Sequence, residues 1–340
     1  MSSNMKKIKL ISVFVITLIF SGCLKDNPVE IMRDMTDSAE MLVYFETNGD
    51  YINSNKMPSF VKASEVFSNL NNYIILDIRP KEKFLDGHIP GSKNVEMKNL
   101  MEIVDQMKDS TQKIVIVSST GQAAAYATSL LRLAGYDKIY SLQWGIASWN
   151  SKFAKEWYRM VKNGFLVGRY NFQNYPKPDY SELPEVELGK GLTSELIKFR
   201  VKKLLEEGFE KVRIDIDDIM KTYNQQSNTL DYFVICYAPT RLYNIRDNGH
   251  PPTTVRYQPY EDLKSTTYLQ TLPVNKPIAV YEDTGEISAY VVAYLKVLGY
   301  DVYSINLGAN GMFGEDQSNS SRIIRLKSTD IMNYPVETGE

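Results

Sequence analysis

The stretch KIVIVSSTGQAAAYATSLLRLAGY, residues 113–136, contains the pattern that decides the fold. Residues 114–117 (IVIV) form a short apolar run, which is typical of a parallel strand buried on both faces. A polar loop follows, and residues 123–133 then have the apolar spacing of a helix that ends before Gly135. A strand, a loop and a helix in this order predict one unit of an α/β fold.

The same unit occurs twice in the chain. Three segments of one half have counterparts in the same order in the other half: Gly87-His88 and Gly249-His250, Thr120-Gly121 and Thr284-Gly285, and GYDKIYSL at 135–142 and GYDVYSI at 299–305. The spacing between the loop glycine and the glycine that ends the helix is the same in both copies. A duplicated domain is the simplest explanation.

The two copies predict the same succession of strands and helices. Apolar runs predict strands at 73–78, 114–117 and 139–142 in the first copy, and at 233–236, 278–281 and 302–305 in the second. Helical spacing occurs at 97–107, 123–133, 194–207 and 289–298. We therefore expect an α/β protein of two domains, each a parallel sheet flanked by helices on both faces.

Composition narrows the class of function. The chain is 43% hydrophobic and 24% charged, as in packed globular proteins, and its net charge of -2 lacks the basic footprint of a nucleic-acid-binding protein. Two cysteines and two histidines are too few for a disulfide framework or a His/Cys metal cluster. We expect no metal, no cofactor and no nucleic-acid partner.

The first residues have the pattern of an export signal. The basic segment KKIK is followed by an apolar run at 10–20, which is too short to span a bilayer, and then by Phe20-Ser21-Gly22-Cys23. These residues resemble the lipobox of bacterial lipoproteins, with Phe20 where leucine is usual. The resemblance implies that Cys23 is lipidated and anchors the protein to a membrane of the bacterial cell envelope, on a leaflet that the sequence leaves open. A plain secretory signal with an incidental cysteine is the alternative.

The chain divides into six segments. We expect a lipoprotein signal peptide at 1–22, a tether and helical segment at 23–57, a first domain at 58–156, a linker at 157–194, a second domain at 195–318 and a C-terminal tail at 319–340. The linker assignment depends on residues 171–191, which are rich in proline, charge and tyrosine.

The first domain resembles a rhodanese domain. The resemblance is carried, in order, by the segments Leu76-Asp77-Ile78-Arg79, Gly87-His88-Ile89-Pro90-Gly91-Ser92, the strand and loop at 113–122, and Trp144-Gly145-Ile146-Ala147-Ser148-Trp149. In that family the loop reads C-x-x-G-x-R-S, and its cysteine carries a sulfur atom from a donor such as thiosulfate to an acceptor. The second domain resembles the family mainly through the internal repeat.

Neither copy has the loop cysteine that the resemblance implies. Counting three residues back from the loop glycine places Ser118 at the nucleophile position of the first domain and Glu282 at that of the second. A serine hydroxyl is not ionised near neutral pH without an adjacent base, and a carboxylate at a helix N-terminus would itself occupy the anion site. The loop arginine is replaced as well, by Ala123 and Ile287.

Two interpretations remain for the first loop, which comprises Ser118, Ser119, Thr120, Gly121 and Gln122. Its backbone N–H groups and hydroxyls at a helix N-terminus are able to bind a polar or anionic ligand. Alternatively, it is a strand–helix turn capped by its own hydroxyls, which is the simpler reading.

The other chemically notable residues have structural explanations. Cys236 lies in an apolar run, where a free cysteine is usually a small buried hydrophobe. His88 and His250 have the glycine- and proline-rich context of turn or packing residues rather than of general bases, and Asp77 with Arg79 suggests an ion pair that orients a strand end.

The leading hypothesis is therefore a lipid-anchored binding or scaffold protein without sulfur-transfer activity, with an unknown protein partner. A divergent sulfurtransferase that uses Cys236 or a partner's thiol is the alternative, and an anion sensor built on the first loop is a third possibility.

Overall fold

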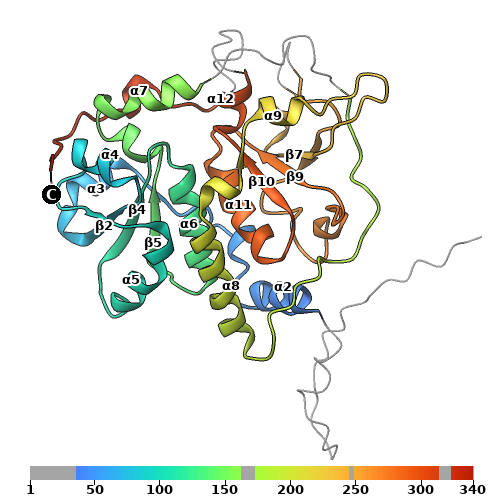
Figure 1. Ribbon diagram of the computed structural model, residues 1–340, viewed down its shortest axis with the longest axis horizontal. Coiled ribbons are helices and arrows are strands. Elements are labelled where there is room, and N and C mark those ends of the chain that lie inside the picture. The colour runs from blue at the N-terminus through green and yellow to red at the C-terminus, as the bar shows by residue number, and fades with distance from the viewer. Residues whose placement is uncertain (1–35, 162–172, 245–248, 314–322, 340) are drawn as a thin grey trace, which may run out of the picture. The chain divides into compact units, whose positions relative to one another are not determined.

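Two five-stranded parallel sheets of identical strand order form the framework of the protein (Figure 1). The first sheet has the order β1-β5-β4-β2-β3, with β1 (Phe60–Val61), β2 (Tyr73–Asp77), β3 (Lys93–Asn94), β4 (Lys113–Val117) and β5 (Ile139–Leu142). The second has the order β6-β10-β9-β7-β8, with β6 (Arg213–Ile214), β7 (Phe233–Tyr237), β8 (Val255–Tyr257), β9 (Ile278–Tyr281) and β10 (Val302–Ile305). The expected α/β fold with two domains is confirmed.

The computed structural model describes residues 36–161, 173–244, 249–313 and 323–339. The predicted signal segment and Cys23 lie outside these ranges. No helix within them is both long enough and apolar enough to cross a bilayer.

Helices precede and follow the strands in both domains. The α-helices are α2 (Asp37–Thr47), α3 (Ala63–Ser68), α4 (Lys81–Asp86), α5 (Leu100–Gln106), α6 (Gln122–Leu133), α7 (Ser151–Met160), α8 (Thr193–Glu207), α9 (Ile216–Met220), α10 (Thr240–Tyr243), α11 (Glu286–Val297) and α12 (Gly308–Phe313). Short 3-10 helices lie at Tyr51–Asn53, Leu70–Asn72, Met97–Asn99, Gly145–Ser148, Phe209–Lys211, Leu269–Thr271 and Ser328–Asp330. The sequence predicted the inner strands and the helices α5, α6, α8 and α11. It did not predict α7 or the edge strands β1, β3, β6 and β8, three of which have only two residues.

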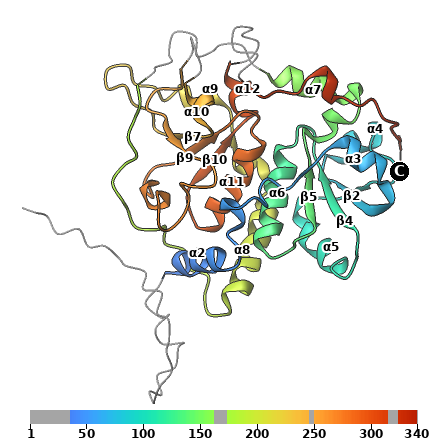
Figure 2. The same cartoon turned by 180° about the vertical axis from the view of Figure 1, so that it is seen from behind.

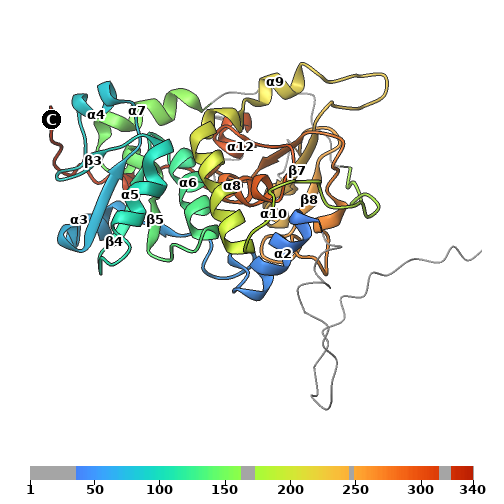
Figure 3. The ribbon, with the colours of Figure 1, turned by 60° about the horizontal axis from the view of Figure 1, so that its bottom comes forward.

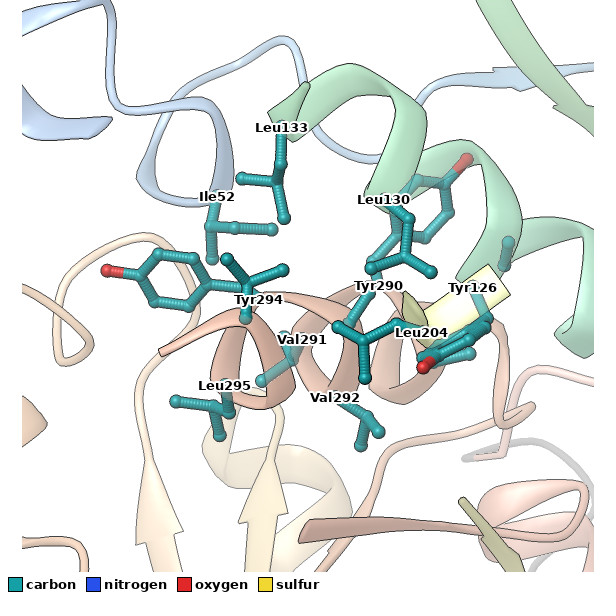
Figure 4. Packing of buried hydrophobic residues seen from close by; sticks show 14 of the residues in the cluster. Ile52, Tyr126, Leu130, Leu133, Leu204, Tyr290, Val291, Val292, Tyr294 and Leu295 are labelled. Carbon is teal, nitrogen blue, oxygen red and sulfur yellow. The ribbon is translucent and has the colours of Figure 1, made fainter. Parts of the chain in front are cut away.

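Helices α6 and α11 pack against each other between the two sheets, and their contact joins the domains into one hydrophobic core (Figures 2 and 4). Leu130 from α6 and Val291 from α11 are both fully buried in this core. Polar bonds fix the register of the contact. The Tyr290 hydroxyl lies 2.8 Å from Ser141 Oγ and donates to the Ser59 carbonyl at 3.0 Å, while Ser129 Oγ donates to the Tyr290 carbonyl at 2.9 Å.

The segment before the first sheet packs on the second domain. Helix α2 lies beside α8 (Figure 3), and the Phe45 and Tyr294 rings are 5.8 Å apart. Glu46 accepts hydrogen bonds at 2.6 Å from the backbone and the hydroxyl of Ser265. The N-terminal segment therefore stabilises the domain that follows later in the chain.

The C-terminal segment, residues 323–339, returns to the first domain in the reverse manner. His88 and Glu337 form a backbone bridge, and the Trp149 indole donates to the Pro335 carbonyl at 2.8 Å. Tyr334 stacks on Phe67 with ring centroids 3.9 Å apart. The part of the predicted tail that the structure describes, residues 323–339, thus packs on the first domain and ends beside α3 and α4 (Figure 1).

Candidate functional site

The first loop connects β4 to α6, and its serine hydroxyl is held by the loop backbone. Ser118 Oγ accepts hydrogen bonds from the amides of Gly121 and Ala124, each at 3.2 Å. Ser118 is buried, with an exposure of 4%. Gly121 turns the chain into α6 with a φ of 96°, a conformation that glycine adopts without steric cost. The hydroxyl therefore stabilises the start of α6, as the simpler interpretation of this loop expects.

Gly145, which follows β5, packs closely against the backbone of the first loop. The Ile146 amide donates to the Ser118 carbonyl at 2.9 Å. A Cβ atom at Gly145 would lie 2.3 Å from the same carbonyl oxygen, so no other residue fits there without moving the backbone. The second domain repeats this arrangement, with Gly308 against the Glu282 carbonyl at the same 2.3 Å.

The second loop, residues 282–286, binds its own carboxylate. Glu282 accepts from the Thr284 amide at 2.8 Å, from the Thr284 hydroxyl at 3.2 Å and from the Ile287 amide at 3.2 Å. Burial, assisted by the neighbouring Asp283, raises the pKa of Glu282 to about 7. The Glu282 side chain thus fills the place at the N-terminus of α11 where an external anion would bind.

An ion pair closes the outer side of the second loop. Arg241 donates to Asp283 Oδ1 at 2.9 Å and also contacts Oδ2. The same carboxylate accepts from the Ile324 amide at 2.9 Å, and Asn310 binds the carbonyls of both Asp283 and Ile324. The C-terminal segment therefore covers this loop, and all five residues of the second loop are buried.

The first loop, in contrast, opens into a cavity of about 480 Å³. The loop supplies Ser118, Ser119 and Thr120, while Phe209, Arg213 and Asn306 come from the second domain. These last three residues were not predictable from the sequence, because only the packing of α6 on α11 brings the second domain to the mouth of the first loop. The dipole of α6 and the backbone amides of the first loop favour the binding of a polar or anionic group in this cavity.

Asp77 and Arg79 form a buried ion pair at the rim of this cavity. Arg79 Nη2 lies 2.6 Å from Asp77 Oδ2 and also donates to the Gly87 carbonyl at 2.7 Å. The Arg79 guanidinium therefore binds Asp77 at the end of β2 and Gly87 in the turn after α4. The pair holds the wall of the cavity in place.

Cys236 is buried in the middle of the second sheet. It pairs with Tyr281 of β9, as Asp77 pairs with Val117 of β4, so it takes the place of Asp77 in the second domain. Its exposure is 0%, and burial raises the pKa of its thiol to about 12. A thiol in this state is a poor nucleophile near neutral pH.

The two histidines have matching structural positions. His88 stacks on Phe84 at 3.8 Å between centroids, and His250 stacks on Tyr243 at 4.1 Å. His88 Nδ1 also lies 3.0 Å from the Phe84 carbonyl. Both imidazoles are buried, and neither lines the cavity over the first loop. Within the described ranges, no three His, Cys, Asp or Glu side chains gather into a possible metal site.

The comparisons with known proteins agree with the motifs of the first domain. The sequence profile of the Rhodanese-like domain matches residues 63–152. The chain is 30% identical over 83 residues to thiosulfate sulfurtransferase GlpE of Pseudoalteromonas translucida and 34% identical over 76 residues to GlpE of Shewanella oneidensis. These matches span 24% and 22% of this chain, and 78% and 74% of the two relatives. The chain belongs to the rhodanese-like family.

A solved structure is similar over most of this rhodanese-like chain. The thiosulfate sulfurtransferase from Pseudomonas aeruginosa is 14% identical, with a TM-score of 0.29, and the match covers 89% of this chain and 48% of that one. In the rhodanese-like protein described here, Ser118 and Glu282 both direct side-chain oxygen atoms at the amides of their own loop.

Proposed function

We propose that this rhodanese-like protein is a binding module without sulfur-transfer activity, and that the cavity over the first loop is its ligand site. The observation that carries the proposal is the state of Ser118. Its hydroxyl accepts hydrogen bonds from two backbone N–H groups, and it lies at the position where the family pattern has a cysteine. Oxygen cannot replace sulfur as the carrier of a persulfide, and no base lies in the loop sequence to ionise the hydroxyl.

The alternative, a sulfurtransferase that uses Cys236, is not supported by the position of that residue. Cys236 is the one cysteine within the described ranges, and it lies inside β7 among apolar side chains. A reactive thiol requires an exposed, electropositive setting. Sulfur transfer through Cys236 would require this buried thiol to become exposed.

A sulfur-transfer assay with mass analysis tests the proposal. The purified protein is incubated with thiosulfate, one portion is assayed for thiocyanate formation from cyanide, and another is measured as intact mass. We expect no turnover and no added sulfur atom. Turnover that disappears in Cys236→Ala, or a persulfide mapped to Cys236, would establish the sulfurtransferase instead.

We further propose that Cys23 carries a lipid that holds this binding module at the bacterial cell envelope. The support is the sequence Phe20-Ser21-Gly22-Cys23 directly after an apolar run of signal-peptide length. Metabolic labelling with an alkyne fatty acid in the native host tests this proposal. Wild-type protein is expected to incorporate the label and to sediment with membranes, whereas Cys23→Ser is expected to lose both properties. Equal labelling of the two proteins would contradict a lipid on Cys23.

A further inference from the structure

The two loops differ in one respect that shows what the first loop is able to bind. In the second loop, the amides of Thr284 and Ile287 donate to the Glu282 carboxylate. By position after the strand and around the glycine, their counterparts in the first loop are Thr120 and Ala123. Among the described residues, neither of these two amides has a hydrogen-bond acceptor, because the short Ser118 hydroxyl accepts from Gly121 and Ala124 instead.

Thr120 and Ala123, the two residues with the vacant donors, both line the cavity of about 480 Å³. In the second domain, the Glu282 carboxylate thus occupies the position beside the two amides, and in the first domain the equivalent position holds no carboxylate. Two backbone N–H groups and the threonine hydroxyl at the start of a twelve-residue helix are the donors that hold this carboxylate. Helix α6 has the same length as α11 and begins at the same point after the glycine.

A second, independent feature lies across the same cavity. Asn306 follows β10, is 9% exposed and lines the cavity. Its Nδ2 donates to Asp215 at 3.0 Å, but its Oδ1 has no hydrogen-bond partner among the described residues. A buried acceptor without a donor is costly, and a ligand N–H or O–H group would remove that cost.

The charges of the cavity favour a single carboxylate over a polyanion. The lining contains as many cationic as acidic side chains, namely Arg79, Lys83 and Arg213 with Glu156, Glu207 and Glu210. Each cation is already paired at 2.6 Å, Arg79 with Asp77, Lys83 with Glu156 and Arg213 with Glu210. A dianion such as sulfate or thiosulfate would therefore find no free counter-charge, whereas one carboxylate needs only the loop amides.

We propose that the cavity binds a small carboxylic acid with a hydrogen-bond donor and an apolar body. Its carboxylate accepts from the Thr120 and Ala123 amides, its donor binds Asn306 Oδ1, and its apolar part lies against Met97, Met160 and Phe209, which also line the cavity. The volume is in the range of sites for small molecules. This inference rests on the proposed binding function and specifies its ligand class.

Three probes of one shape test the inference by amide-resolved NMR on the purified protein. Hippurate has a carboxylate, an amide N–H and a phenyl ring. Hippuramide lacks the carboxylate, and 4-oxo-4-phenylbutyrate has a methylene in place of the N–H. We expect hippurate to cause saturable shifts of the Thr120 and Ala123 amides, and each of the other probes to bind about tenfold more weakly. With Asn306→Leu, hippurate and 4-oxo-4-phenylbutyrate should bind equally.

A loop variant copies the second loop into the first. Ser118→Glu should place its own carboxylate on the Thr120 and Ala123 amides and abolish hippurate binding. The second loop shows that this backbone accommodates glutamate at that position. Ser68→Glu, the same exchange at an exposed site of α3, is the control and should bind hippurate like wild type.

Three results would overturn the carboxylate site: absence of saturable shifts with hippurate, equal binding of hippurate and hippuramide, or unchanged binding to Ser118→Glu. The sulfur-transfer assay on the same preparation separates the two proposals. Absence of both turnover and hippurate binding removes the carboxylate site alone, whereas turnover removes the non-catalytic function.

Discussion

Gln122 and Glu286 occupy equivalent positions in the two domains, and each side chain crosses to bind the other domain. Gln122 Oε1 accepts from the Leu307 amide at 2.8 Å, and Glu286 Oε1 accepts from the Trp144 amide at 2.9 Å. Leu307 and Trp144 are themselves equivalent, and both have left-handed backbone conformations, with φ of 51° and 65°. Each domain thereby provides the hydrogen-bond acceptor for the backbone amide of a left-handed residue in the other domain.

The reciprocal contact requires glycine in both loops. A Cβ atom on Gly121 would lie 2.1 Å from the Glu286 carboxylate, and one on Gly285 would lie 2.1 Å from the Gln122 amide. Gly121 and Gly285 are therefore required both for the packing of the two domains and for the turn into each helix.

Replacing Gln122 by alanine should weaken the protein at this contact. Gln122→Ala leaves the buried Leu307 amide without its acceptor, which costs about 1–3 kcal/mol. Urea unfolding should show a lower midpoint for this variant. Gln106→Ala, at an exposed position at the end of α5, is the matched control and should unfold like wild type. Equal midpoints for Gln122→Ala and Gln106→Ala would contradict a stabilising role.

The buried carboxyl groups predict that stability falls as the pH rises. Burial raises the pKa of Glu282 to about 7 and the pKa of Glu286 well above its ordinary value of 4.5. The folded state therefore holds more protons than the unfolded state, so the contribution of Glu282 is fully present below about pH 4.5 and is lost as the pH rises through about 7. The loss for Glu282 is about 3 kcal/mol.

Unfolding at pH 5 and pH 8 in matched variants measures this effect. Glu282→Gln cannot titrate, so the difference in the free energy of unfolding between the two pH values should be smaller than in wild type. Glu185→Gln removes an exposed carboxyl group and should leave the difference unchanged. The same pH dependence in Glu282→Gln and wild type would show that Glu282 has an ordinary pKa.

A cysteine placed in the first loop should reveal whether this loop is able to activate a thiol. Ser118→Cys places a thiol beside the amides of Gly121 and Ala124, which lower a thiol pKa at a helix N-terminus. We expect the thiolate of this variant to take the outer sulfur atom of thiosulfate, with release of sulfite, and to gain one sulfur atom in intact mass, although more slowly than an enzyme with the loop arginine. Ser119→Cys, one residue farther along, is the control. If the thiol of Ser118→Cys reacts no faster than the thiol of Ser119→Cys, the amides of the first loop do not activate a thiol.

Cys236 should resist modification in the folded protein. Its burial and its pKa of about 12 keep the thiolate unpopulated near neutral pH. Peptide mapping after iodoacetamide treatment should show Cys236 unmodified under native conditions and fully alkylated in guanidinium chloride. Rapid native alkylation at Cys236 would show that β7 opens and would revive the sulfurtransferase alternative.

Much of the fold was predictable because local pattern and global fold agree in this chain. The strand at 113–117 is apolar on both faces, as a central parallel strand must be, and the glycine-ended helix after it has one face for the sheet. The edge strands escaped prediction because a strand such as Phe60–Val61 makes too few pairs to leave a pattern in the sequence.

The sequence by itself determined the two domains, their order and the identity of the residues three positions before the two loop glycines, Ser118 and Glu282, since strand periodicity and the residue at a fixed distance from a glycine are local properties. Only the tertiary structure decided which segments meet. The crossing of Gln122 and Glu286, the return of residues 323–339 to the first domain and the approach of Asn306 to the first loop join residues at least 142 positions apart. Such contacts arise because α6 and α11 bury their apolar faces on each other, and no short sequence pattern encodes the geometry of that contact.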